Sequence, residues 1–299
     1  MSNVHLHLIS RLNAVGSDGL ASAVRRCIRE GVTGKQDLAH IAGAVLRQLP
    51  YLGIQDTTSI LAGLAKVHYR NFQLFSALVE RLGQVGEIPL KEASVLLHSF
   101  SKIHFNNSDL TAKCADVVKS NIDAIRPKEA AKLLHALTKL RYEDAALLSG
   151  LVASTQQHLT DLDDCSLANF VIGCAKITVS DKTIALICQE LTARAGTLGP
   201  LEALRSLLAL VHFKAHKDAN ATSNNIVKTL NCNLLSLLQL TLVLESVAAL
   251  GSQGAQRISA ALLRKRDTYA TVPPDLDSRI QAALAAVAVG QRDESPSGE

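Results

Sequence analysis

Four lysines recur along the chain at an almost constant spacing of 36, 37 and 37 residues, at Lys66, Lys102, Lys139 and Lys176. The next two equivalent positions, 36 and 37 residues further on, hold His212 and Ala249. If each lysine marks the same place in a repeated unit, stacking the units about 10 Å apart aligns the ammonium groups into a ladder of positive charge. Such a ladder suits a phosphodiester backbone, because cations at a fixed rise meet phosphates at a fixed rise.

Other side chains share this surface if the lysine is taken as the anchor of a helix. Positions seven and four residues before the anchor fall near it on a helical wheel. These residues, with Arg141 just beyond one anchor, form what we call the candidate ridge. Its members are Lys66, His98, Lys102, Lys132, His135, Lys139, Arg141, Lys176, Arg205 and His212.

The recurrent lysine can also be interpreted in two further ways. A lysine near a helix C-terminus interacts favourably with the helix dipole, which alone would favour lysine there. The ridge could also face an acidic protein partner rather than a nucleic acid. A secondary basic cluster of Arg257, Arg264, Lys265 and Arg266 either extends the ridge or is solvated helix surface, and the second interpretation is favoured.

The elements that would position these residues are pairs of helices. Helix A of the clearest unit is expected over 127–141, with a core stripe at Leu133, Leu134, Leu137 and Leu140. Helix B is expected to begin at the capping residues Asn71, Asn107, Asp144 and Asp181. We therefore predict an all-α fold, an ARM/HEAT-like α-solenoid of six to seven two-helix repeats with a period of about 37 residues. The predicted units are 17–50, 54–86, 89–125, 127–161, 164–197, 200–231 and 233–270.

The ends of the chain are expected to differ from its body. Residues 1–16 are predicted to be a flexible start or a targeting segment, because the first 30 residues are rich in arginine and lack an acid before Asp18. A helix that caps the array is the open alternative for this start. Residues 17–290 are predicted to form a single repeat domain, closed by a helix at about 276–289. Residues 291–299 are predicted to be a disordered tail.

Composition excludes several classes of protein. Hydrophobic residues make up 47% of the chain and aromatic residues 3%, a Leu- and Ala-rich balance that favours helices. The net charge of +4 is only mildly basic, and the six cysteines show no CxxC spacing, which indicates reduced thiols. No apolar run is long enough to cross a bilayer, so we predict a soluble protein without membrane contact.

Motifs of catalysis are missing from the sequence. It holds no Gly-rich phosphate loop, no GxSxG and no HExxH. His212 and His216 lie four residues apart, as metal ligands do, but no acidic or cysteine partner follows at a usable spacing. We therefore predict no catalytic residue, metal, cofactor or small-molecule substrate. Aromatic residues three positions after the anchor, at Tyr69, Phe105 and Tyr142, are expected to pack in the core rather than to stack on bases.

The recurring phrase resembles a known class of repeats. Its clearest copies are SILAGLAKVHYRN, VLLHSFSKIHFNN and KLLHALTKLRYED. They are similar to the octotricopeptide and heptatricopeptide repeats of organellar RNA-binding proteins and to FAST-kinase-like repeats, over about residues 54–254. The resemblance does not extend to the RAP domain that often follows such repeats.

The resemblance implies an α-solenoid in a mitochondrion or plastid that acts in RNA processing, editing, stability or translation. Short repeat-only proteins of this kind serve as subunits of mitochondrial RNA-editing complexes and mitoribosomes in protists. The leading interpretation is a non-enzymatic mitochondrial protein that binds single-stranded organellar RNA and organises other protein subunits. The alternative is a protein–protein scaffold of the ARM/HEAT type with no direct RNA contact.

Overall fold

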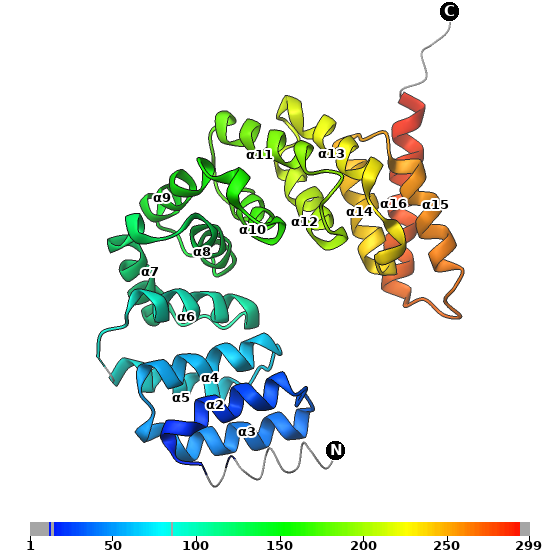
Figure 1. The fold of residues 1–299 in the computed structure, drawn as a ribbon. Helices are drawn as coiled ribbons and strands as arrows, with labels where there is room; N and C mark the ends of the chain where they lie inside the picture. Colours follow the sequence, from blue (N-terminus) through cyan, green and yellow to red (C-terminus); the bar gives the residue numbers. More distant parts are fainter. Residues whose placement is uncertain (1–11, 13–14, 85, 294–299) are drawn as a thin grey trace, which may run out of the picture. The chain divides into compact units, whose positions relative to one another are not determined.

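The computed structural model describes residues 12, 15–84 and 86–293. Within those residues it contains α-helices joined by turns and short 3-10 helices, and no β-strand (Figure 1). The predicted all-α class is confirmed. The chain divides into two compact units between Leu151 and Val152, and each unit is described by itself below.

The first unit consists of helical hairpins in chain order. Its α-helices are α2 (Ser17–Arg29), α3 (Lys35–Gln48), α4 (Ile54–Lys66), α5 (Phe72–Gln84), α6 (Leu90–Ile103), α7 (Ser108–Ser120) and α8 (Pro127–Lys139). Short 3-10 helices, η1 (Leu49–Tyr51) and η2 (Ile122–Ala124), connect one hairpin to the next. The first helix of each hairpin packs on the first helix of the next, so α2 contacts α4, α4 contacts α6 and α6 contacts α8.

The helix α9 (Ala145–Gln156) contains the division, and the second unit continues the hairpin pattern. Its α-helices are α10 (Asp164–Cys174), α11 (Asp181–Ala193), α12 (Pro200–Leu210), α13 (Lys217–Thr229), α14 (Leu237–Leu250), α15 (Ala255–Arg266) and α16 (Pro274–Asp293). The 3-10 helices are η3 (Leu159–Asp161), η4 (Val211–Phe213) and η5 (Cys232–Leu234). Here α10 contacts α12, α12 contacts α14, and α11 contacts α13.

The predicted core stripe of the first helices is buried. Leu133, Leu134, Leu137 and Leu140 of the fourth hairpin all lie in the core, as do Leu96, Leu97 and Phe100 of the third. The position three residues before the anchor holds only small residues, and Gly63 shows why. A Cβ on Gly63 would stand 3.0 Å from Cδ1 of Ile28, so even an alanine there would require the side chain of Ile28 on α2 to shift.

Most helix starts follow the predicted caps, and one is shifted by one residue. The side chains of Asn71, Asn107 and Asp144 accept hydrogen bonds from backbone N–H groups three residues later, as expected of N-caps. Asp164 is the first residue of α10, and the prediction was wrong for Asp181, which is the first residue of α11. Their caps are Asp163 and Ser180, which accept from the N–H groups of Ser166 and Thr183, because the side chain before the first helical residue is the one that reaches those groups.

The sixth hairpin has polar residues where its neighbours have apolar ones, yet α13 forms. Thr222 and Ser223 are buried in it. The hydroxyl of Ser252 donates to Oγ of Ser223 across 2.7 Å, and the hydroxyl of Thr192 donates to Oγ1 of Thr222 across 3.2 Å. These hydrogen bonds join α13 to α11 and to the turn after α14, so the polar side chains are satisfied between hairpins.

The two predicted ends of the chain lie partly outside the described residues. Most of the predicted start, 1–16, lies outside them, as do residues 294–299 of the predicted tail. The final helix exists as α16, packs on α14 and α15, and runs to Asp293, three residues into the predicted tail. The single repeat domain at 17–290, the superhelix and the number of repeats stay predictions.

Candidate functional site

A repeated turn positions the anchor lysines of the first unit. After the first helix, the residue two beyond the anchor adopts a left-handed conformation at His68, His104 and Arg141, with φ of 52°, 54° and 57°. The next residue then donates its N–H back across the helix end, in the pairs Tyr69 to Leu64, Phe105 to Phe100 and Tyr142 to Leu137. This is a Schellman cap, which ends the helix and packs the following side chain on its last turn. The cap places Tyr69, Phe105 and Tyr142 next to the last turn of their helices, where they are half-buried rather than in the core, and leaves the anchor at the helix end.

Four residues of the candidate ridge gather between α6 and α8. The pKa of His98 is lowered to about 4 by burial, and then by the positive charges of Lys102, Lys132 and Lys139. His98 and Lys102 come from α6, and the other two lysines come from α8. Lys139 is exposed, while the other three are half-buried. The structure therefore brings these predicted residues together into one positive patch.

A second group of basic residues lies at the turns of neighbouring hairpins. The charge of Lys139 lowers the pKa of His104, followed by burial and by the charges of Arg70 and His68. His68 and Arg70 belong to the turn after α4, His104 to the turn after α6, and Lys139 ends α8. Basic side chains of three successive hairpins thus influence one another. Arg141, also on the ridge, is exposed at the turn after α8.

A groove across α2, α4 and α6 extends this surface toward the start of the first unit. Its volume is about 800 Å³, and its basic lining residues are Arg25, Arg29, Lys66 and Lys91. The acids Asp56 and Glu92 also line it, so the groove has mixed charge. Arg25 and Arg29 were not among the predicted site residues. The signal was in the sequence, because Arg29 lies 37 residues before Lys66 and Arg25 four residues before Arg29.

The second unit holds a weaker version of the ridge. Burial lowers the pKa of His212, and the nearby charge of Lys176 lowers it further, so these two predicted residues lie close together. Arg205, however, donates a hydrogen bond from Nη2 to Oδ1 of the buried Asn169, which ties it to α10. In the first unit, His135 on α8 is a further residue of the candidate ridge and is half-buried. A ladder continuous from Lys139 to Lys176 stays a prediction.

The secondary basic cluster is largely engaged within the chain. Arg257 donates to the carbonyl oxygens of Val227, Lys228 and Leu230 at the end of α13. Lys265 donates to the carbonyls of Asn233 and Leu235 around η5, and Arg266 forms an ion pair of 2.7 Å with Asp277. Arg264 is exposed and donates to Ala260 within its own helix. We therefore assign Arg257, Lys265 and Arg266 a structural role and leave the whole cluster out of the candidate site.

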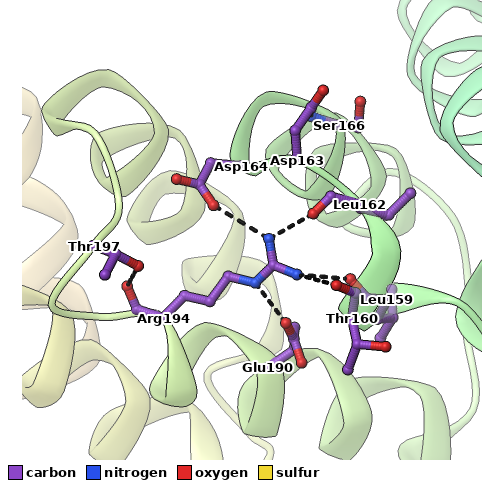
Figure 2. Close-up of polar contacts among 9 residues, drawn as sticks. All are labelled: Leu159, Thr160, Leu162, Asp163, Asp164, Ser166, Glu190, Arg194 and Thr197. Atoms are coloured by element: carbon purple, nitrogen blue, oxygen red, sulfur yellow. Dashed lines mark hydrogen bonds and ion pairs between the residues drawn. The ribbon is translucent and has the colours of Figure 1, made fainter.

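Arg194 shows the same structural use of a cation in the second unit (Figure 2). Its guanidinium donates from Nη1 to the carbonyl of Leu162 at 2.6 Å and to Oδ1 of Asp164 at 3.2 Å. Nη2 donates to the carbonyls of Leu159 and Thr160, and Nε to a carboxylate oxygen of Glu190. The side chain therefore satisfies the connector η3 and the start of α10 from the end of α11.

No catalytic centre stands out in the part of the chain that the structure covers. Among the described residues, no group of three or more His, Cys, Asp or Glu side chains is arranged to hold a metal ion. The cysteines are free thiols, and burial raises the pKa of Cys114 to about 12, which suppresses the reactive thiolate. None of the helices within 12, 15–84 and 86–293 has the length and hydropathy of a membrane span.

One protein-family model matches the chain. The model of the RNA-editing substrate-binding complex 6 protein family matches residues 13–198. This range covers the first unit and the start of the second, including α6, α8 and the turns between them. No curated protein matches the chain.

Proposed function

The chain belongs to the RNA-editing substrate-binding complex 6 (RESC6) protein family, and on that premise we propose that it is a non-catalytic subunit of an RNA-editing complex. The name of the family describes the binding of a substrate within an assembly. A protein of stacked helical hairpins fits that role, because such hairpins offer long surfaces to several partners at once.

Within that role, we propose that the first unit binds RNA directly through the candidate ridge. One observation carries this step, the convergence of Lys102, Lys132 and Lys139 around His98. Cations of like charge repel one another, so a surface on which Lys102, Lys132 and Lys139 lie close enough to lower the pKa of His98 favours a polyanionic partner. The mildly basic net charge of +4 is no obstacle, because the charge is concentrated locally.

The finer features of the function follow from the resemblance of the repeats and remain part of the proposal. They are single-stranded organellar RNA as the ligand, other proteins of a ribonucleoprotein complex as partners, and the mitochondrion as the location. Single-stranded RNA suits an open helical surface, because its phosphates and unpaired bases are both accessible to side chains.

The alternative function is a scaffold that contacts only proteins. The observation that favours it is the groove across α2, α4 and α6, where Asp56 and Glu92 stand among the basic residues. Mixed charge at a groove suits a peptide or helix that carries both signs of charge.

Ultraviolet crosslinking of the purified complex, followed by mass spectrometry, separates the two functions. Direct binding predicts RNA crosslinks on peptides from α6, α8 and the turns that follow them. Treatment with nuclease before purification should then weaken the association of those partners that are held through RNA. An unchanged set of partners after nuclease, with no RNA crosslink on this chain, would support the scaffold and reject direct binding.

A further inference from the structure

An exposed aromatic ring stands at the turns of the second and third hairpins. Phe72 is the first residue of α5 and is 78% exposed. Its ring centroid lies 5.9 Å from that of Phe105, in the turn after α6. Phe105 in turn lies 5.8 Å from Phe75 and 5.5 Å from Phe100, and both of these are buried. The exposed ring is therefore supported by an aromatic cluster that extends into the core, which holds it in place.

Basic residues belong to the same two turns as this ring and its partner Phe105. Arg70 precedes Phe72 by two residues, and His104 directly precedes Phe105. Because the two rings are in contact, the two turns lie side by side. Lys139 and His68 lie close enough to His104 to lower its pKa, together with Arg70. We call His68, Arg70, Phe72, His104 and Lys139 the turn edge.

The backbone of these turns differs from that of the first and last hairpins in the residue type at the left-handed position. In the first and last hairpins the left-handed position is held by Gly31 and Gly251, which adopt it without strain. The equivalent residues of three consecutive hairpins are His68, His104 and Arg141. A side chain at positive φ is less favourable than glycine, so glycine would serve the fold better. Basic side chains at these turns interact favourably with the C-terminal end of the helix dipole, and they also place positive charge on the exposed turns.

We propose that the turn edge is a base-stacking site for single-stranded RNA, in which an unpaired base stacks on Phe72 while Arg70 and Lys139 contact the flanking phosphates. The inference rests on the proposed function and adds to the ridge a site that holds a base. The favoured ligand is RNA rather than an acidic peptide, because a carboxylate-rich chain would use the cations but not the exposed ring.

The test uses the absence of tryptophan from this chain. A Phe72→Trp variant carries the sole tryptophan, so its fluorescence reports directly on stacking. The matched control is Tyr51→Trp, at a residue that is 75% exposed in η1, before α4 rather than after it. Each variant is titrated with a single-stranded uridine oligonucleotide and with an abasic oligonucleotide of the same length.

Stacking predicts that the uridine oligonucleotide quenches the Phe72→Trp variant and that the abasic one quenches it much less. The Tyr51→Trp control should change little with either. A Phe72→Ala variant should bind the uridine oligonucleotide about tenfold more weakly, with an unchanged circular dichroism spectrum, because the ring is exposed.

The failure of this site can be distinguished from the failure of RNA binding. If the uridine oligonucleotide binds but does not quench Phe72→Trp, and Phe72→Ala binds equally well, the stacking site is wrong and the ridge proposal stands. Equal quenching by the uridine and abasic oligonucleotides also rejects stacking. If the unmodified chain binds neither oligonucleotide, direct RNA binding fails, and the stacking site fails with it.

Discussion

The guanidinium of Arg194 donates to the carbonyl oxygen of Leu162 across 2.6 Å, so a residue at the end of α11 satisfies the backbone just before α10. Arg81 does the same for Leu52 in the first unit, through a hydrogen bond of 3.0 Å from Nε. These two arginines therefore satisfy the connectors between hairpins, unlike the basic residues of the turn edge, which lie at exposed turns and helix ends.

Removing the guanidinium of Arg194 should destabilise the fold. The change Arg194→Met keeps much of the aliphatic stem but leaves the carbonyls of Leu159, Thr160 and Leu162 without this donor. We expect the free energy of unfolding to fall by about 1.5–3 kcal/mol, as for hydrogen bonds from charged groups. Urea unfolding followed by circular dichroism measures the change. The control Arg264→Met, at an exposed residue, should stay within about 0.5 kcal/mol, and equal effects of both changes would contradict the assignment.

Core residues of the first helices should be costly to truncate. Leu134 and Leu137 are fully buried, so Leu134→Ala and Leu137→Ala should each lower the free energy of unfolding by about 2–5 kcal/mol. Leu208 serves as the control, because it occupies a ridge position and is exposed. Leu208→Ala should cost less than about 1 kcal/mol. A loss well under 1 kcal/mol at Leu134 would show that the register of α8 is wrong.

Glycine at a left-handed turn should leave the fold intact. At His104, relief of the strain, about 1–2 kcal/mol, outweighs the greater freedom of glycine in the unfolded chain, about 0.5–1 kcal/mol. His104→Gly should therefore be slightly more stable than the unmodified chain, while it removes one basic group from the turn edge. The comparison is His40→Gly in the interior of α3, which should lose roughly 0.3–0.5 kcal/mol, because histidine is itself less favourable in a helix than alanine. Thermal unfolding of both variants measures these changes in stability. A clear loss of stability in His104→Gly would contradict the strain assigned to this turn.

Stability should depend on pH through His98. Burial and the charges of Lys102, Lys132 and Lys139 lower its pKa to about 4, whereas an unfolded histidine titrates near 6.5. Between these values the unfolded chain binds a proton that the folded chain does not, so the free energy of unfolding falls as pH drops from about 6.5 to about 4. His98→Gln removes this contribution. From pH 7 to pH 5 the variant should lose on the order of 1 kcal/mol less than the unmodified chain, after allowance for solvent screening. If the free energy of unfolding depended on pH in the same way in both proteins, the lowered pKa of His98 would be contradicted.

Much of the fold follows from local patterns in the sequence. Leu133, Leu134 and Leu137 predict the buried face of α8, and Asn107 predicts the start of α7, because helical period and capping act over a few residues. The start of α11 is shifted by one because the adjacent residues Ser180 and Asp181 can each cap.

The candidate site was harder to predict, because it depends on contacts between hairpins. The spacing of the lysines indicated that Lys102 and Lys139 share a surface, but it could not show that Arg257 and Lys265 are bound to carbonyls some 30 residues away. Phe72 was missed because an aromatic residue in an apolar helix looks like core. Its 78% exposure and its contact with Phe105 of the next hairpin depend on how the two hairpins pack, which the local pattern does not show.

The salt dependence of RNA affinity tests the central claim most directly. Fluorescence anisotropy of a labelled single-stranded RNA gives the dissociation constant of the unmodified chain and of the Lys102→Glu, Lys139→Glu double variant over a range of salt concentrations. The control is the Lys35→Glu, Lys113→Glu double variant, which makes the same charge change at exposed positions of the second helices. We predict that the ridge variant binds more weakly and that its plot of log affinity against log salt is shallower by about 1.4, or about 0.7 for each lost phosphate contact. Equal affinities and equal slopes for the ridge and control variants would contradict RNA binding by the ridge.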